Sequence, residues 1–334
     1  MPRGGLFIYI SVSTQIETIS DAVSGWAPRS SHQQSSATRW KVEIPTVALS
    51  VVIFAGYALL TCRFRQMPLW LAAPLMALWL TWYGSLQHET IHDHPTPWRR
   101  LNSLLGSLPL ALWIPYRVYR VTHLQHHRHG GRGLTDASRD PESFYLHPGT
   151  LARQGRLRRA LCLANCTLAG RLTIGPALAV YAFWLSEVRK LRAGDGARKA
   201  IWARHILAVA LVLIWVTQIC HIPLWTYLLC VIYPSISLTQ LRSFAEHRAD
   251  DDPTRRTVAV EAHLFWSLLF LNNNLHIAHH AYPRLSWYKL PSAWRQLRNH
   301  ALDRGLIAGG YLEVAQSYLL HPVISPEHPG LERP

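Results

Sequence analysis

Cysteine is scarce in this chain and is not arranged for metal binding. The five cysteines are spread over 334 residues, each lies in or beside an apolar run, and no two form a CxxC pair. This distribution argues against a thiolate-bound zinc or iron–sulfur site, and it shows no disulfide framework. We therefore expect buried and chemically inert cysteines.

Acidic residues are also few. The chain has 19 Asp and Glu against 34 Lys and Arg, which gives a formal net charge of +15. Such an excess favours a nucleic acid, an anionic lipid surface or an acidic partner protein. The arginines flank apolar segments and do not form one stripe. We therefore expect no nucleic-acid partner and attribute the charge to orientation in a membrane.

Charged residues are missing from the middle of four apolar segments, each close to the roughly 20 residues that cross a bilayer as a helix. They are Ile44–Cys62, Met67–Leu86, His205–Cys220 and Leu224–Leu238, and the last two are somewhat short. Many of the 14 tryptophans lie at the ends of apolar runs, where an aromatic belt meets the membrane–water boundary. Two further apolar stretches are broken by Gly and Pro, and we interpret them as interfacial or re-entrant: Leu101–Pro115 and Leu172–Leu185.

Four spans in two hairpins place residues 87–204 and 240–334 on the same side of the membrane. The first of these segments is rich in arginine, so the positive-inside rule makes that side cytoplasmic, although Arg63 and Arg65 lie on the other side. We predict an all-α, multi-pass membrane protein in three parts. These are a mobile cytoplasmic leader over residues 1–42, a membrane domain over 43–291 and a C-terminal cytoplasmic tail over 292–334.

Histidine, in contrast, is abundant and clustered. Directly after the second span comes His88-Glu-Thr-Ile-His92, and a helix that leaves the membrane here places both imidazoles on one face, one turn apart. The string also matches HExxH, the zinc hydrolase motif in which Glu89 would be the general base. That alternative leaves the other histidine clusters unexplained.

Two HxxHH clusters and one single histidine follow on the same predicted membrane face. With the first pair they give nine candidate imidazole ligands, enough for two metal ions with four or five each: His88, His92, His123, His126, His127, His247, His276, His279 and His280. Neutral imidazole suits iron, copper and zinc. We expect the nearby acids Glu89, Asp93 and Glu246 to orient ring N–H groups.

The order HxxxH, HxxHH, single His, HxxHH around two membrane hairpins resembles the membrane fatty acid desaturase and hydroxylase superfamily, most closely its bacterial fatty acid desaturases. Further strings resemble that family over Ile44 to Pro291. They are Asp136–Glu142, Arg242–His247, Asn272–Pro283 and Trp287–Pro291.

The resemblance implies a cytoplasm-facing cap with two iron ions held by the nine histidines, and O2 as co-substrate. It also implies a tunnel for an acyl chain, carried by a lipid or an acyl carrier. A separate ferredoxin or reductase would supply electrons, and the location would be a bacterial inner membrane. Family members complete one metal shell with an asparagine four residues before the single histidine. Ser243 stands there, and Asn272 is a substitute candidate.

Three other functions fit parts of the pattern. A carotenoid or lipid hydroxylase or ketolase would use the same ligands. A metal transporter should carry ionisable groups inside its spans, whereas the clustered histidines lie beyond the span ends. A zinc hydrolase would need only His88, Glu89 and His92.

Overall fold

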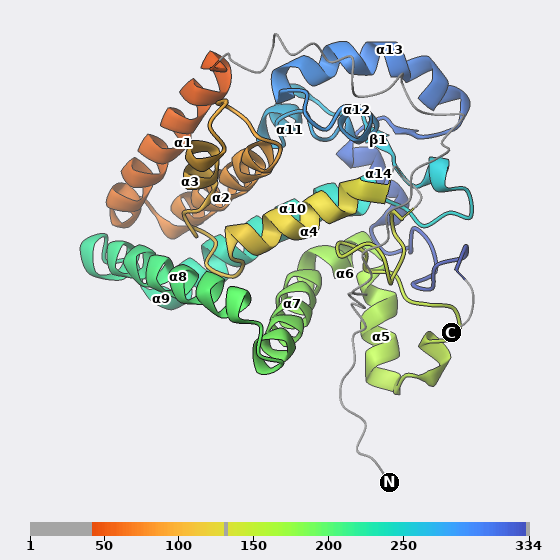
Figure 1. Cartoon of the computed structure of the whole chain (residues 1–334), viewed down its shortest axis with the longest axis horizontal. Coiled ribbons are helices and arrows are strands. Elements are labelled where there is room, and N and C mark those ends of the chain that lie inside the picture. The colour runs from red at the N-terminus through yellow and green to blue at the C-terminus, as the bar shows by residue number, and fades with distance from the viewer. Residues whose placement is uncertain (1–41, 130–132, 332–334) are drawn as a thin grey trace.

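The computed structural model describes residues 42–129 and 133–331, so nearly all of the predicted leader lies outside the described residues. The described chain is mostly helical (Figure 1). Its β structure consists of a two-stranded parallel pair, β1 (Ala259–Val260) and β2 (Ile307–Ala308), and two isolated bridges. The predicted all-α fold is confirmed.

Four long apolar helices form two hairpins. The first hairpin is α1 (Ile44–Arg63), extended by a 3-10 turn over Phe64–Gln66, and α2 (Leu69–Ile91). The second is α8 (Gly196–Leu213), continued by a π-helical segment over Ile214–Ile219, and a returning helix made of α9 (Leu224–Thr226), a π-helical Tyr227–Ile232 and α10 (Tyr233–Glu246). All four are long and apolar enough to span a membrane.

The second hairpin is longer than its apolar pattern predicts. Its first helix begins at Gly196, ahead of the basic residues Arg198 and Lys199. Its second helix continues to Glu246, and Arg242 Nη1 donates to Glu246 Oε2 at 2.9 Å. Hydropathy ends each span where charge begins, but the backbone helix continues, because a charged residue changes the solvent preference of a helix without breaking it.

The spans pack through one continuous apolar core. Ile53 of α1, Met76 of α2 and Val216 after α8 are all fully buried in it. The Trp79 indole packs over Gly56 and donates from Nε1 to Ile53 O at 2.8 Å. A Cβ at Gly56 would lie 2.0 Å from that ring, so the close approach of α1 and α2 requires glycine here.

Between the hairpins the chain forms shorter helices: α3 (Arg99–Gly106), α4 (Tyr116–His126), α5 (Arg156–Asn165), α6 (Leu168–Thr173) and α7 (Gly175–Arg192). The irregular segment 107–115 inserts among the spans. Its carbonyl groups accept hydrogen bonds from Tyr83 and Tyr227 hydroxyls, each at 2.7 Å, and from Trp184 Nε1 at 2.8 Å. Irregular backbone at such a depth persists only where the protein satisfies it.

The C-terminal region packs onto the end of the molecule where the histidines lie. It contains α11 (Leu264–Leu269), α12 (His276–Ala281), α13 (Leu290–Asp303) and α14 (Tyr311–Tyr318), and α13 lies across the top of Figure 1. The segment after residue 292, predicted as a tail, contributes the buried side chains of Trp294 and Tyr311. Further on, Leu146 N donates to Pro326 O at 2.8 Å, which ties the last residues to the 133–146 loop.

Candidate metal centre

The first histidine pair stands at the end of α2. His88 lies in the last turn of the helix, and His92 is its C-terminal cap, with its backbone N–H bonded to Glu89 O at 3.0 Å. The two ring centroids lie 4.9 Å apart. The helix therefore continues far enough to place both imidazoles on one face, as the HxxxH spacing predicts.

The other candidate ligands come from three more elements. His123 and His126 lie in the last turn of α4, and His127 begins the 3-10 turn that follows it. His247 directly follows α10, and α12 carries the remaining three on its six residues: His276, His279 and His280. Four separate elements thus meet at one end of the spans.

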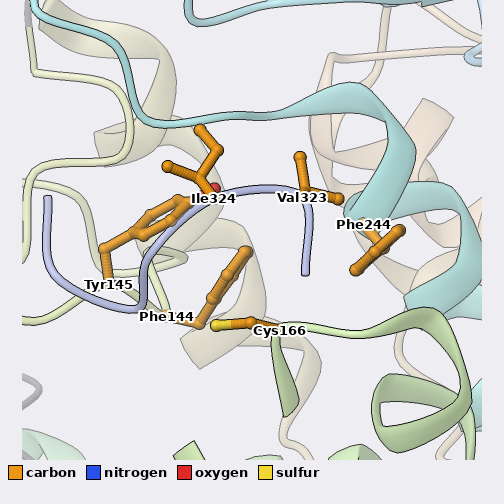
Figure 2. A pocket seen from close by; sticks show the side chains of 6 residues that line it. All are labelled: Phe144, Tyr145, Cys166, Phe244, Val323 and Ile324. Carbon is orange, nitrogen blue, oxygen red and sulfur yellow. The ribbon is translucent and has the colours of Figure 1, made fainter. Parts of the chain in front are cut away.

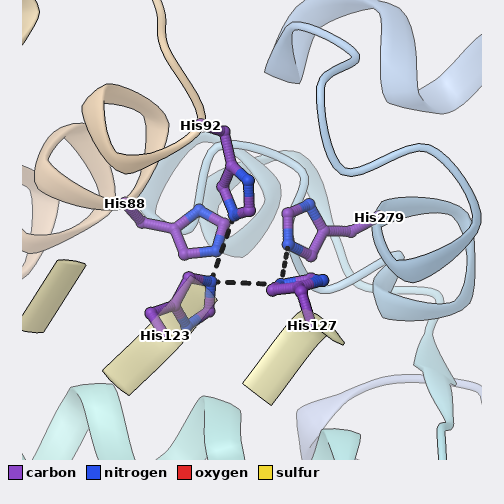
Figure 3. A group of neighbouring side chains, drawn as sticks. All are labelled: His88, His92, His123, His127 and His279. Atoms are coloured by element: carbon purple, nitrogen blue, oxygen red, sulfur yellow. Dashed lines mark hydrogen bonds between the residues drawn. The ribbon is translucent and has the colours of Figure 1, made fainter. Parts of the chain in front are cut away.

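The nine imidazoles gather into two groups, and within each group the ligand atoms lie within 4.8 Å of one another. The first group is His88, His92, His123, His127 and His279; the second is His126, His247, His276 and His280. Figure 3 shows the five rings of the first group turned toward one centre. The groups adjoin, since the rings of His127 and His280 stack with centroids 4.3 Å apart.

Hydrogen bonds fix the tautomer of several of these rings. Nδ1 of His123 lies 2.8 Å from Glu142 Oε1, and Nδ1 of His126 lies 2.8 Å from Asp140 Oδ1. An ionised carboxylate only accepts, so each Nδ1 carries a hydrogen, and once the ring is neutral its Nε2 presents a lone pair. Nδ1 of His276 is held in the same way by Asn273 Oδ1 at 3.1 Å.

Those Nε2 atoms face one another at the separation that a shared metal ion requires. His123 Nε2 lies 3.1 Å from Nε2 of both His92 and His127. In the second group His276 Nε2 lies 2.8 Å from His247 Nε2. Opposed lone pairs repel unless a cation lies between them. With metal–nitrogen bonds of about 2.0–2.1 Å, neighbouring ligands stand about 2.8–3.4 Å apart, so the donor set fits two metal ions.

Burial keeps most of these imidazoles neutral. Desolvation, reinforced by neighbouring imidazoles, lowers the pKa well below its usual value for His92, His127, His276, His279 and His280. It lowers the pKa of His247 to about 3. Burial also acts on His126, but the charges of Asp140 and Glu142 outweigh it and raise that pKa to about 9. A metal ligand must be unprotonated, and the environment favours that form at the positions with a lowered pKa, whereas at His126 the metal has to displace a proton.

The residues predicted to orient ligands have different outcomes. Glu246 Oε2 lies 3.4 Å from His276 Nδ1, so this acid contacts a candidate ligand. Glu89 Oε1 is 3.9 Å from His88 Nδ1, and its other oxygen accepts Trp287 N–H at 3.1 Å. Asp93 instead pairs with arginines: its Oδ1 lies 2.8 Å from Arg120 Nη2.

The Asn272 side chain lies apart from the histidines. Its side-chain amide donates to Trp287 O at 3.1 Å, away from the histidines. Its neighbour Asn273 lies between the two groups, with Oδ1 on His276 and Nδ2 3.3 Å from His88 Nε2. The helical spacing fails because α12 begins only at His276, and Asn272 has a positive φ of 55°.

Asp140, Glu142 and Asn273 are the functional residues that sequence reasoning missed. The two acids lie in the Asp136–Glu142 string that resembles the desaturase family, but nothing in local spacing joins them to His126 and His123, which are 14 and 19 residues away. The C-terminal segment holds their loop, since His328 Nε2 lies 3.0 Å from Thr135 Oγ1.

Four helices able to span a membrane, with two adjoining groups of imidazoles at one end of them, define a class of helical membrane proteins with a candidate metal centre. The fatty acid desaturase family model matches residues 65–308, so the chain belongs to the fatty acid desaturase family. A comparison with curated proteins gives no match. Membership confirms the superfamily that the histidine order predicted.

Proposed function

We propose that the protein is a di-iron, O2-dependent desaturase that removes two hydrogens from the alkyl chain of an acyl lipid. The observation that carries the proposal is the convergence of five and four imidazoles into two adjoining groups. Imidazole binds iron among other metals. Membership of the fatty acid desaturase family supports an oxidation as the reaction, and iron as the metal. Two iron ions held there would supply the activation of O2 and the abstraction of hydrogen from an unactivated methylene.

The chain's own residues hold the ligand rings in place before any metal binds. Glu142, Asp140 and Asn273 each fix the Nδ1 side of one ring, so the Nε2 lone pairs remain aimed inward. The ligands His123, His126 and His276 are 2–3% exposed, which keeps bulk water from the reacting centre. A site that generates an oxidant strong enough to attack a methylene needs this exclusion of water, because exclusion prevents side reactions.

An apolar groove supports an alkyl substrate. Residues of α1 and α3 line it together with the Pro95–Thr96 turn, and its volume is about 450 Å³. The lining includes Val51, Phe54 and Leu105. Pro95 follows His92 by three residues, so part of the groove wall belongs to the segment that carries a candidate ligand. We propose this groove as the entry for the acyl chain.

A second recess is not a substrate site. It is enclosed by six side chains, which Figure 2 labels: Phe144, Tyr145, Cys166, Phe244, Val323 and Ile324. It does not admit even a water-sized sphere. We interpret it as the packing junction where the C-terminal segment meets the 133–146 loop.

We propose that the histidine end faces the cytoplasm. The segments on that end include the exposed arginines Arg153, Arg156 and Arg159, and the positive-inside rule places such residues in the cytoplasm. In the described part of the chain the cysteines form no cluster for iron and sulfur. Electrons therefore come from a separate ferredoxin or reductase, and a basic face attracts an acidic donor.

The geometry disfavours a zinc hydrolase. His88 and His92 stand among five imidazoles instead of with a single open position. Glu89 would be the general base of a zinc hydrolase, but one of its carboxylate oxygens already accepts a hydrogen bond from the Trp287 backbone N–H. Hydroxylation of a lipid or carotenoid would use the same ligands, and the product of the reaction distinguishes it from desaturation.

The test is expression in a bacterium followed by gas chromatography–mass spectrometry of total lipid fatty acids. The intact protein should produce a new unsaturated species, and His279→Ala should not. His321→Ala is the matched control, because His321 is exposed and outside both imidazole groups. An unchanged fatty-acid profile from an inserted, iron-loaded protein, with an electron donor supplied, would refute acyl desaturation. A hydroxylated lipid in its place would establish the alternative.

A further inference from the structure

Two cysteines far apart in the sequence lie side by side at the end of the spans remote from the histidines. Cys62 is in the last turn of α1, and Cys220 directly follows the π-helical segment after α8. Their Sγ atoms are 4.0 Å apart. Cys62 is exposed and Cys220 is buried. The exposed Cys62 departs from the expectation of buried cysteines, and no local spacing pairs the two, since 158 residues separate them.

The surrounding contacts hold this arrangement in place. Trp215 Nε1 donates to Thr61 Oγ1 at 3.0 Å, which fastens the last turn of α1 to the second hairpin. Thr61 is fully buried, and its hydroxyl donates back to Tyr57 O at 2.8 Å. Thr61, next to Cys62, is therefore joined through its side chain to Trp215, and the Trp215 carbonyl accepts the Cys220 backbone N–H at 2.9 Å.

The cysteine pair and the metal centre lie at opposite ends of the spans. α2 runs from just after Cys62 to His88 and His92, and the returning helix of the second hairpin runs from just after Cys220 to His247. A helix of 23 residues is about 35 Å long at 1.5 Å per residue, which is a membrane thickness. If the metal centre faces the cytoplasm, Cys62 and Cys220 face the opposite compartment, where disulfides form and persist.

We propose that Cys62 and Cys220 form a disulfide that joins the two hairpins on the extracytoplasmic side. The proposal rests on the membrane orientation given under the proposed function. A disulfide needs its sulfur atoms about 2.05 Å apart, so they must approach by about 2 Å. The exposed Cys62 side chain has room to rotate toward Cys220.

The difference in exposure between Cys62 and Cys220 determines which thiol reacts first. A disulfide-bearing thiol oxidoreductase of that compartment reaches the exposed Cys62 first. The Cys62 thiolate attacks the donor's disulfide and forms a mixed disulfide, releasing one donor thiolate. The buried Cys220 thiolate then attacks Cys62 Sγ and releases the second donor thiolate. The Cys62–Cys220 disulfide forms, the donor's disulfide is reduced to a dithiol, and the two thiol protons of Cys62 and Cys220 pass to the donor.

The remaining cysteines provide internal controls. Cys162 lies within α5 and Cys166 caps the C-terminal end of that helix, among the segments at the histidine end, and Cys230 lies within the fourth span. Their thiols should stay reduced. Of the five cysteines in the chain, two should therefore be oxidised and three free.

The test is thiol counting on the full chain in bacterial membranes. Membranes are dissolved at harvest in a denaturing detergent that contains N-ethylmaleimide, so that buried free thiols are blocked as well. The protein is then reduced, and the released thiols are labelled with a maleimide polymer that shifts the band on a gel. The wild type should take up two labels, whereas Cys62→Ser and Cys220→Ser take up none and Cys230→Ser keeps two. A non-reducing digest should contain the cross-linked Cys62 and Cys220 peptides.

Two results would overturn the proposal: no label on the wild type, or two labels that persist in Cys62→Ser. Fatty acids from the same cells separate this inference from the proposed function. A lipid product without labels refutes only the disulfide. Labels without any lipid product, with iron and an electron donor supplied, refute only the desaturase.

Discussion

Asp140 should govern how tightly the second imidazole group holds its metal. Its Oδ1 lies 2.8 Å from Nδ1 of His126, and both side chains are almost fully buried. The substitution Asp140→Asn keeps the shape but removes the charge that fixes the ring. A hydrogen bond to a charged group contributes about 1.5–3 kcal/mol. At about 1.4 kcal/mol per factor of ten, the metal should bind about 10- to 100-fold more weakly.

The assay is dialysis of iron-loaded protein against a series of chelator concentrations, with iron per chain measured by mass spectrometry. In Asp140→Asn one of two iron ions should leave at about 10- to 100-fold lower chelator, and the other at the wild-type midpoint. Asp136→Asn is the matched control, because Asp136 is a buried acid of the same loop that accepts Ser138 N–H and contacts no histidine ligand in the described structure. Equal midpoints for Asp140→Asn and wild type, or an equal shift in the control, would refute the reasoning.

Three further predictions follow from other contacts. Asn273→Leu removes the amide between His88 and His276, so iron content should fall and the iron spectrum of the protein should change; a wild-type spectrum would contradict this. Ala55→Trp fills the groove and should reduce product formation at unchanged iron content, whereas Leu59→Trp, one turn further along α1 and outside the lining, should not; equal losses would argue against the groove. Glu187 is a buried carboxylate whose pKa desolvation would raise, but bonds from Trp202 and Arg198 and the charge of Lys190 lower it. Its contribution to stability, about 1–3 kcal/mol, should be present above pH about 4.5 and disappear as the pH falls through the lower folded value. The melting temperature in detergent should show this, and a Glu187→Gln variant that retains the same pH dependence would contradict it.

The candidate histidine ligands could be predicted because their spacing is local. HxxxH and HxxHH place imidazoles on one helical face whatever the rest of the fold does, and all nine lie in the two groups. The two hairpins were predictable for a similar reason, since apolar length determines a span. The ends of the second hairpin were not, because α10 continues past the apolar residues to deliver His247.

The contacts that could not be predicted depend on turns and irregular loops, which bring residues together without a regular spacing. Asp140 and Glu142 reach their histidines through an irregular loop that the C-terminal segment holds from nearly 200 residues away. Asn273, and not Asn272, contacts the histidines, because Leu271 and Asn272 both have a positive φ and the chain turns there just before α12. The proximity of Cys62 and Cys220 depends on how the two hairpins pack, which no local pattern encodes.

The central claim is that nine histidines hold two iron ions in adjoining sites. Its most direct test is the iron content of the purified protein, loaded with ferrous iron without oxygen, combined with Mössbauer spectroscopy. The account predicts about two iron ions per chain with nitrogen-rich ligation, and about one after His276→Ala, because the first group keeps its five imidazoles. A wild type that holds a single ion, or one that retains zinc and takes up no iron, would contradict it.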